Sequence, residues 1–353
     1  MKVAMVITSL EVGGAEKMVL DLIRRIRDQI EVRLFIIKKN YHTIYDDEVK
    51  KLNIHYYYLQ ASNRIFCIFA ALRLRKLLHE YRPDIIHSHL KAADYVYFYY
   101  LGSKNFKWVH TVHTMASIDT KFIRRLYLKR PYQKEIIKAV AVSKTVSDSI
   151  YMLYRVQPFL IPNGIDLNRY TSKKSGADNL KIIHIGRFVP VKNHSYLVKE
   201  FSKLVAVNRK VKLILIGDGP TKRRIVRLVK KAGIARNVRF ISFTNEVDKY
   251  LREAGIFVLP SLYEGLPLSL LEAMASGLVV VVSRAVPEPV EDEVNGFMFD
   301  LEENALFYLL QDIIDNYDKL GNLRENAHLR AQEYAIDTMA KQYLALYERI
   351  LHD

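Results

Sequence analysis

The sequence predicts an α/β fold of two doubly wound domains, each a parallel sheet covered by helices on both faces. The chain has 353 residues, and 50% of them are hydrophobic, which is enough for more than one packed core. Short apolar runs alternate with amphipathic helical patterns, and this alternation starts again near residue 180. We expect a first domain over residues 1–165, a second over 166–330 and a C-terminal segment over 331–353.

The first domain contains short runs that are apolar almost throughout, as strands buried on both faces of a sheet are. The strands predicted from these runs cover residues 3–7, 32–37, 84–87, 107–112 and 138–143. Amphipathic stretches at 15–27 and 68–80 predict helices between them.

The second domain repeats this pattern. Its predicted strands cover residues 180–185, 211–216, 238–241, 256–259 and 278–282. Open sheets of this kind bind ligands beyond the carboxyl ends of their strands, so we expect the active site in a cleft between the two domains. The spacing of apolar residues in 331–353 predicts a further helix.

The charge of the chain is strongly positive and unevenly distributed. Lys and Arg number 54 against 38 Asp and Glu, a net charge of +16, and residues 1–170 hold 28 of the basic and 15 of the acidic side chains. This excess favours an anionic partner for the N-terminal half.

Cysteine content and hydropathy indicate the compartment. A single cysteine, Cys67, excludes an internal disulfide and favours a reducing environment. No apolar run approaches the roughly 18 residues of a spanning helix, and the first one, residues 3–10, is too short for a secretory signal. We expect a cytoplasmic protein, soluble or peripherally bound to a membrane.

The loop after the first strand contains Gly13 and Gly14 and leads into a helical pattern. Paired glycines at this position allow the backbone to approach a ligand and direct N–H groups at an anion. Neither the dinucleotide fingerprint nor a P-loop is present. A tight turn that requires glycine is the alternative.

Cations and carboxylates follow two strands of the second domain. The first delivers Gly186, Arg187 and Lys192, and two cations beside a strand end are suited to a diphosphate. The second is followed by Glu264, by a helix predicted to begin near Leu268, and by Glu272 in that helix. Carboxylates accept from hydroxyls and free helix N–H groups bind phosphate, which suits a nucleotide sugar. A solvated surface pair and a glutamate placed for the helix dipole are the alternatives.

Several strings of this sequence, in this order along the chain, resemble the retaining glycosyltransferases of family four, the group 1 glycosyltransferases. They are GGAE (13–16), DIIHSH (84–89), AVSK (141–144), IPNGID (161–166), IGRFVPVKN (185–193), LILIGDGP (213–220) and PSLYEGLPLSLLEAMASG (260–277). The resemblance implies the GT-B fold, in which two Rossmann-like domains face each other across a cleft. It also implies that the segment 331–353 packs back on the N-terminal domain.

The resemblance assigns roles to individual residues. Gly13 and Gly14 match a loop near the donor diphosphate and the acceptor, and His113 matches a histidine that contacts the donor sugar. Arg187 and Lys192 match the diphosphate-binding pair. Glu264 matches the glutamate near the transferred sugar, and Glu272 matches the one that holds the ribose hydroxyls. The remaining implied positions are the donor-binding residues Gly186, Gly265, Leu266, Pro267 and Leu268 and the hinge residues Asn163 and Gly164.

The activity that the resemblance implies is transfer of a sugar, with retention, from a nucleoside-diphosphate sugar to a lipid-linked or polysaccharide acceptor in bacterial surface glycan synthesis. A UDP-sugar is the expected donor, and no separate cofactor is expected. The sequence has no D-x-D string, so we expect no essential metal, with catalysis by His113, Glu264, Arg187 and Lys192.

Other functions remain open at this point. His87, His89, His110 and His113 lie at the ends of two neighbouring predicted strands, so a four-histidine metal site is an alternative. A sugar-nucleotide epimerase with the same fold and a basic nucleic-acid-binding protein are two more. We expect no nucleic-acid partner, because no motif for one is present.

Two basic segments interleave apolar and cationic residues, at 64–82 and 121–138. Such segments suit the surface of an anionic membrane, so we expect a peripheral protein on the inner face of the plasma membrane. The cations expected at this surface, or at the acceptor, are Arg73, Arg75, Lys76, Lys121, Arg124, Arg125, Lys129 and Arg130. The alternative is an apolar face packed on the sheet with solvated cations.

Overall fold

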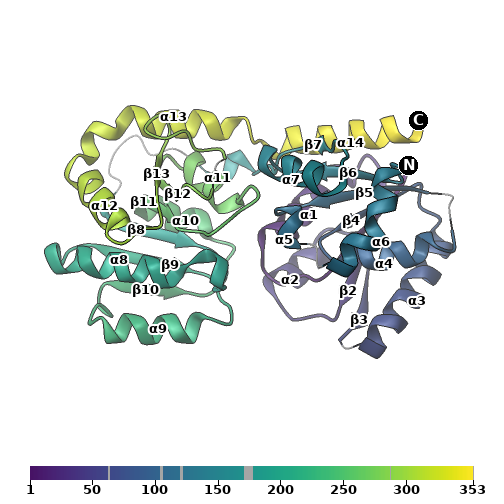
Figure 1. The fold of residues 1–353 in the computed structure, drawn as a ribbon, viewed down its shortest axis with the longest axis horizontal. Helices are drawn as coiled ribbons and strands as arrows, with labels where there is room; N and C mark the ends of the chain where they lie inside the picture. The colour runs from purple at the N-terminus through teal and green to yellow at the C-terminus, as the bar shows by residue number, and fades with distance from the viewer. Residues whose placement is uncertain (63, 104–105, 120–121, 171–177, 287, 353) are drawn as a thin grey trace. The chain divides into compact units, whose positions relative to one another are not determined.

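A computed structural model describes residues 1–62, 64–103, 106–119, 122–170, 178–286 and 288–352. The chain forms two compact units (Figure 1). Unit 1 comprises Met1–Gly164 together with the C-terminal helix, and unit 2 comprises Ile165–Ala335. Each unit is a parallel sheet with helices, which confirms the predicted α/β fold class.

Unit 1 contains a seven-stranded sheet in the order β3-β2-β1-β4-β5-β6-β7. The strands are β1 (Lys2–Ile7), β2 (Glu31–Lys38), β3 (His55–Ala61), β4 (Ile85–His89), β5 (Lys107–Val112), β6 (Ile137–Ala141) and β7 (Phe159–Leu160). Neighbouring strands all pair in parallel. The strand order reverses between β1 and β4, so the loops after these two strands are the expected place for a ligand.

Eight α-helices lie in the described part of unit 1. They are α1 (Gly14–Ile26), α2 (Ile44–Lys50), α3 (Arg64–Tyr81), α4 (Ala92–Tyr100), α5 (Ala116–Asp119), α6 (Phe122–Gln133), α7 (Lys144–Tyr154) and α14 (Ile336–His352). The last of these is joined to the sheet by two buried hydrogen bonds. Tyr347 Oη lies 2.6 Å from His87 Nδ1, and Tyr343 Oη lies 3.0 Å from Thr111 Oγ1. Residues far apart in the sequence therefore complete one core.

Unit 2 contains a six-stranded parallel sheet in the order β10-β9-β8-β11-β12-β13. The strands are β8 (Asp178–Ile185), β9 (Lys212–Ile216), β10 (Val238–Ile241), β11 (Ala254–Leu259), β12 (Val279–Ser283) and β13 (Phe297–Phe299). The helices are α8 (His194–Val207), α9 (Lys222–Lys231), α10 (Val247–Glu253), α11 (Leu268–Ala275), α12 (Ala305–Asp315) and α13 (Gly321–Gln332), with 3-10 turns η1 (Leu167–Arg169), η2 (Pro190–Lys192) and η3 (Tyr317–Leu320). The strand order reverses between β8 and β11. The loops after these two strands contain Lys192 and Glu264.

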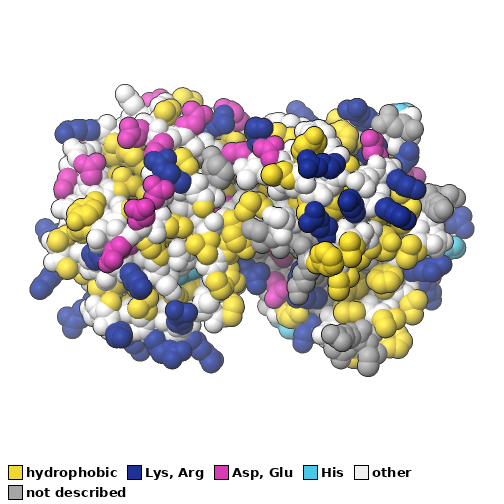
Figure 2. Space-filling view, viewed as in Figure 1, with side chains coloured by type: hydrophobic (Ala, Val, Ile, Leu, Met, Phe, Trp, Pro, Cys, Tyr) yellow, Lys and Arg dark blue, Asp and Glu magenta, His cyan; other side chains and the backbone are white. Residues whose placement is uncertain are grey.

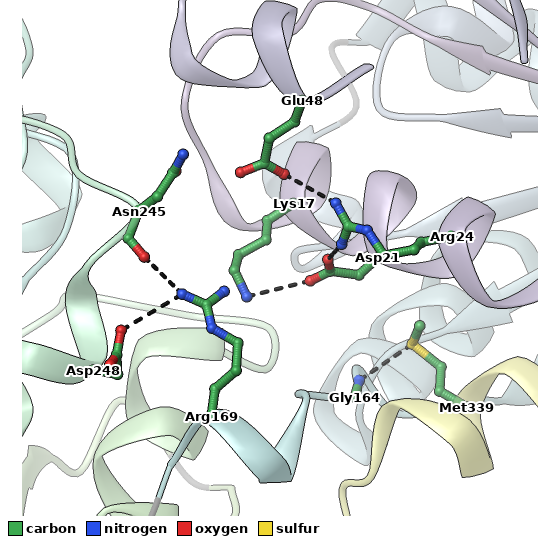
Figure 3. A network of polar contacts seen from close by, with 9 residues as sticks. All are labelled: Lys17, Asp21, Arg24, Glu48, Gly164, Arg169, Asn245, Asp248 and Met339. Atoms are coloured by element: carbon green, nitrogen blue, oxygen red, sulfur yellow. Dashed lines mark hydrogen bonds and ion pairs between the residues drawn. The ribbon is translucent and has the colours of Figure 1, made fainter. Parts of the chain in front are cut away.

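The chain passes between the units twice, after Gly164 and after Ala335. The two crossing segments run side by side, because Ile165 and Ala335 form a parallel bridge and the Ile165 N–H donates to the Tyr334 carbonyl at 2.8 Å. The Gly164 N–H donates to Met339 Sδ at 3.2 Å, which joins the segment after β7 to α14 (Figure 3). The hinge role of Asn163 and Gly164 stays a prediction.

Candidate functional site

In unit 2, the loop after β8 brings Lys192 back against Gly186. A Cβ atom added at Gly186 would lie 3.2 Å from Lys192 Cδ and 3.3 Å from His184 Nε2. A side chain at residue 186 would therefore press on the lysine side chain, and glycine avoids this contact. Gly186 serves packing of this loop as well as any approach of a ligand.

Lys192 and Glu264 form an ion pair, although they come from loops after different strands. Lys192 Nζ lies 2.6 Å from Glu264 Oε1, and the two side chains are 16% and 14% exposed. The Leu262 N–H donates to the Val191 carbonyl at 2.8 Å, which joins the two loops through their backbones. A cation and a carboxylate predicted separately from the sequence thus meet at one point of the unit.

The loop that carries Glu264 runs directly into α11. Pro267 is the residue before the helix, and its side chain cannot cap the first turn. The amides at the start of α11 are therefore suited to an anion. Gly265, Leu266, Pro267 and Leu268 are buried, and Glu272, one turn into the helix, is only 4% exposed.

The loop after β9 lies against the loop after β8, and two glycines make this approach possible. A Cβ at Gly217 would lie 2.1 Å from the Gly186 carbonyl oxygen, and a Cβ at Gly219 would lie 2.6 Å from that of Phe188. Both glycines have φ angles, +143° and +151°, that other residues rarely adopt. Both glycines lie in the string LILIGDGP (213–220), and the family resemblance implies no role for either of them.

His184 is a further polar group at this point that sequence reasoning missed. Its Nδ1 lies 2.8 Å from the Val258 carbonyl, so Nδ1 carries the proton and Nε2 is left with its lone pair. Nε2 is buried and has no hydrogen-bond partner among the described residues. Burial lowers the pKa of His184 to about 4, so the ring is neutral at neutral pH. A histidine inside a predicted strand carries no pattern that marks it as functional.

Arg187 follows Gly186 and is partly exposed. Its guanidinium forms no hydrogen bond or ion pair with the part of the chain that the structure describes. A diphosphate would have to displace Glu264 from Lys192, because the two side chains form an ion pair. It could bind Arg187 without displacing another side chain of the described residues.

In unit 1, neither glycine of the first loop adopts a conformation that requires glycine. Gly13 is extended, with φ −166°, and Gly14 is the first residue of α1. A Cβ at Gly14 would meet nothing within 4 Å. Neither backbone conformation favours a turn that requires glycine, and the open space beside Gly14 at the uncapped start of α1 leaves room for a ligand.

His113 lies at the carboxyl end of β5, beside His89 at the end of β4. His113 Nε2 is 3.2 Å from His89 Nδ1, so one ring donates to the other and the two tautomers are coupled. Burial lowers the pKa of His113 to about 3 and the pKa of His89 well below its ordinary value, so both rings are neutral at neutral pH. His113 Nδ1 and His89 Nε2 have no partner among the described residues.

The four-histidine metal alternative is wrong. His87 is held by Tyr347 and by Thr111, at 2.6 and 2.8 Å, and His110 Nδ1 lies 2.8 Å from Ser88 Oγ. Within the described ranges no group of three or more His, Cys, Asp or Glu side chains is arranged to hold a metal ion. His87 and His110 are satisfied core residues.

The cations expected on a surface of unit 1 divide into three groups. Arg73, Arg75 and Lys76 on α3 are exposed, as are Arg125, Lys129 and Arg130 on α6. The expectation for Arg124 is wrong, because its side chain is buried and is held by Asp94 Oδ1 at 2.6 Å and by the Leu90 carbonyl at 2.7 Å. Lys121 lies outside the described residues.

Apolar side chains are exposed on the same two helices and on α4. Figure 2 shows them beside Lys and Arg on this part of unit 1. They are Phe66, Ile68, Phe69 and Leu72 on α3, Phe98 on α4, and Phe122, Ile123 and Leu126 on α6, each between 49% and 74% exposed. Among the described helices none is both long and apolar enough to cross a bilayer.

Ion pairs join charged side chains of α1 and α2 in unit 1, and Arg169 makes polar contacts near the start of unit 2 (Figure 3). Asp21 holds Lys17 at 3.2 Å and also pairs with Arg24, which reaches Glu48 on α2 at 3.3 Å. In unit 2, Arg169 donates to the Asn245 carbonyl at 2.6 Å, which secures the loop after β10.

Comparison with known proteins identifies the two halves separately. The model of the group 1 glycosyl transferases matches residues 170–330, and that of glycosyltransferase family 4 matches residues 12–169. The chain is 28% identical over 311 residues to a putative glycosyltransferase, EpsF, of Bacillus subtilis, covering 82% of this chain and 81% of the relative.

Two further proteins resemble the chain over nearly its full length. A Campylobacter jejuni relative named N-acetylgalactosamine-N,N'-diacetylbacillosaminyl-diphospho-undecaprenol 4-alpha-N-acetylgalactosaminyltransferase is 24% identical, covering 94% of this chain and 95% of the relative. The crystal structure of Anabaena HepE in complex with UDP-glucose has a TM-score of 0.85 at 18% identity, with 99% of each chain covered. Family models over residues 12–330 and this common fold show that the chain belongs to the group 1 glycosyltransferases and has the GT-B fold.

Proposed function

We propose that this glycosyltransferase transfers a hexose, with retention and without a metal ion, from a UDP-sugar to a lipid-linked or polysaccharide acceptor in bacterial surface glycan synthesis. The observation that carries the proposal is the Lys192–Glu264 ion pair of 2.6 Å beside the uncapped start of α11. A nucleoside-diphosphate sugar needs a cation for its diphosphate and an acceptor for its sugar hydroxyls. This pair supplies one of each.

Leaving-group stabilisation is the main task of these residues in the proposed reaction. As the bond between the anomeric carbon and the diphosphate breaks, negative charge grows on the diphosphate, and preorganised cations and amides stabilise that charge. Arg187, Lys192 and the first amides of α11 would bind the diphosphate. Glu272 would accept hydrogen bonds from the ribose hydroxyls.

Binding of the donor would change the partner of Lys192. Its ammonium group can turn from the Glu264 carboxylate to a phosphate oxygen, and Glu264 then becomes free to accept from hydroxyls of the transferred sugar. In the structure each group neutralises the charge of the other. The pair therefore holds a cation and a carboxylate together at the place where the proposal needs both.

Unit 1 contributes a neutral histidine in this proposal. Because the pKa of His113 is lowered to about 3, its ring acts at neutral pH as a hydrogen-bond donor and acceptor to sugar hydroxyls, and not as a cation. The open Gly13–Gly14 loop would admit the diphosphate or the acceptor. Retention of the anomeric configuration is proposed from the family resemblance alone.

The proposed lipid-linked acceptor is supported by the name of one relative and by the exposed side chains of unit 1. The Campylobacter relative is named for a diphospho-undecaprenol acceptor, and the exposed apolar and basic side chains of α3 and α6 suit an anionic bilayer. We place the protein at the inner face of the plasma membrane as a peripheral enzyme.

Two assays test the proposal. The first compares the melting temperature of the purified chain with UDP-, GDP-, ADP- and CDP-sugars, because a ligand that binds the native state raises it. The second measures nucleoside diphosphate release with and without a lipid-linked acceptor. A transferase releases the diphosphate only with the acceptor, whereas an epimerase of the same fold requires none. If none of the four nucleotide sugars raises the melting temperature, the proposed donor site is wrong.

A further inference from the structure

The charge of unit 2 is divided sharply along the chain. Residues 207–240 contain eleven Lys and Arg and a single acidic residue, Asp218, whereas residues 241–335 contain six basic and seventeen acidic residues. Figure 2 shows Lys and Arg gathered at the α9 end of unit 2 and most of the visible Asp and Glu toward α12 and α13. A nearly balanced total therefore conceals a strongly basic surface.

Helix α9 is the centre of this surface. Ile225 and Val229 are buried and attach the helix to the core of unit 2. The opposite arc carries exposed cations at helical spacings of one, three and four residues. We call the following five residues the α9 basic surface: Arg223, Arg224, Arg227, Lys230 and Lys231.

This arrangement works against the stability of α9. Like charges four residues apart, such as Arg223 with Arg227 and Arg227 with Lys231, repel one another on a helix face. Cations also fill the first turn, where the helix dipole favours anions, and that turn has no acidic residue and no side-chain cap. A helix selected only for stability would have acidic residues at these positions.

The cations of the α9 basic surface have no acidic partners within the described residues. Asp218 pairs with Lys222 at 3.0 Å, outside this set of five, and the side-chain bond of Arg227 goes to the carbonyl of Arg223. The charges therefore remain available to an external anion.

The side chains around α9 favour a lipid surface over a nucleic acid. None of the exposed residues between 222 and 239 is aromatic, so there is no platform on which bases could stack. The amide of Asn237, which could read a base edge, is occupied by the carbonyls of Arg209 and Val211. A convex row of cations on a helix about 15 Å long fits an array of mobile headgroups.

We propose that the α9 basic surface binds the anionic headgroups of a lipid bilayer, as a membrane contact of the donor-binding unit that is separate from the one on unit 1. The choice of a bilayer rests on the proposed function, in which the acceptor is lipid-linked. The two contacts differ in kind. The α9 basic surface has no large exposed apolar side chain and binds through charge alone, whereas α3 and α6 expose Phe66, Ile68 and Phe122.

The test is co-sedimentation of the full chain with phosphatidylglycerol-rich vesicles at low and high salt, with pure phosphatidylcholine vesicles for comparison. Each Lys or Arg near an anionic surface contributes about fivefold to partitioning. Arg223→Gln/Arg227→Gln/Lys230→Gln should therefore lower partitioning at low salt about a hundredfold. Salt should remove the α9-dependent part, because exposed charges are screened.

The matched control is Lys249→Gln/Arg252→Gln/Lys319→Gln, which removes the same charge from other exposed positions of unit 2. It should bind vesicles nearly as the parent does. The inference is overturned by equal losses in both triple variants, by unchanged binding of the α9 variant, or by tighter binding of the parent to duplex DNA than to the vesicles.

Two further measurements separate this inference from the proposed function. The α9 variant should melt at or slightly above the parent temperature, because it relieves repulsion within the helix. In vesicle-free solution with a soluble acceptor analogue, it should release nucleoside diphosphate at the parent rate. Loss of that release would overturn a role confined to membrane contact. Absence of release in the parent itself would overturn the proposed function and leave the vesicle result standing.

Discussion

Lys192 Nζ lies 2.6 Å from Glu264 Oε1, although the two residues are 72 positions apart in the sequence. The contact forms because β8 and β11 are neighbours in the sheet of unit 2, so that the loops after them meet. Both side chains are largely buried. Removing either one leaves a charge that neither water nor a partner fully compensates.

Lys192→Ala is expected to lower the rate of nucleoside diphosphate release by 10²- to 10³-fold, because loss of one preorganised group at a developing charge costs about that much. It should also weaken binding of UDP, measured by calorimetry. Lys199→Ala is the control, since Lys199 is an exposed residue on α8. Near-parent turnover in the purified Lys192→Ala protein would contradict the assignment.

Glu264→Gln should separate donor binding from transfer. Lys192 loses its internal competitor, so UDP should bind as tightly as in the parent or more tightly. Sugar transfer should nevertheless fall steeply, because an amide is a weaker hydroxyl acceptor than a carboxylate. Calorimetric titration with UDP and a turnover assay on the same preparation measure both quantities. A parallel loss of both would mean that Glu264 only holds the loop.

Gly14→Ala should leave the stability of the protein unchanged, whereas Gly217→Ala should lower it. A Cβ at Gly14 meets nothing within 4 Å, whereas a Cβ at Gly217 would lie 2.1 Å from the Gly186 carbonyl oxygen at a φ of +143°. Thermal denaturation should show a parent-like melting temperature for Gly14→Ala and a drop of several degrees for Gly217→Ala. Gly14→Ala should still lose turnover if a ligand approaches this loop. Full activity would restrict the loop to a structural role.

Acid should destabilise the protein below about pH 6.5. Burial lowers the pKa of His113 and of His110 to about 3 from an ordinary value of 6.5. Between these values the unfolded chain binds more protons than the folded one, so the free energy of unfolding falls as the pH falls. The slope is at most about 1.4 kcal/mol per pH unit for each histidine. Urea denaturation across this range should show a smaller slope in His110→Gln than in the parent.

Tyr347→Phe tests the attachment of α14. The variant leaves His87 Nδ1 buried without its 2.6 Å partner, at a cost of about 1–3 kcal/mol in the free energy of unfolding. Tyr151→Phe, at a tyrosine that is 48% exposed, is the control and should change that free energy by less than about 0.5 kcal/mol. Equal effects of the two changes on chemical denaturation would rule out a structural role for the hydroxyl of Tyr347.

The fold could be predicted because strands buried on both faces have a distinctive composition. The strands that sequence reasoning missed lack it. β3 is rich in half-buried tyrosines, and β7 and β13 have only two and three residues. The C-terminal segment was expected to be helical from 331, but α13 ends at Gln332 and α14 begins at Ile336.

The site could be predicted only as residue types, because the contacts depend on which strands are neighbours. Lys192 and Glu264 were expected to serve different parts of one substrate, but their ion pair could not be read from two separate strings. Arg124 was expected at the surface, since nothing local indicates that Asp94 and the Leu90 carbonyl hold it. The basic residues of α9 were not predicted as a surface, because acidic residues elsewhere in the second half of the chain nearly balance their charge.

The place of α14 has a consequence for how the protein is made. Unit 2 is one continuous stretch of chain, so it can fold as soon as residue 335 has left the ribosome. The sheet of unit 1 is synthesised earlier, but His87 and Thr111 receive their hydroxyl partners only when Tyr343 and Tyr347 emerge. The half of the protein that is translated first is therefore the half that is completed last.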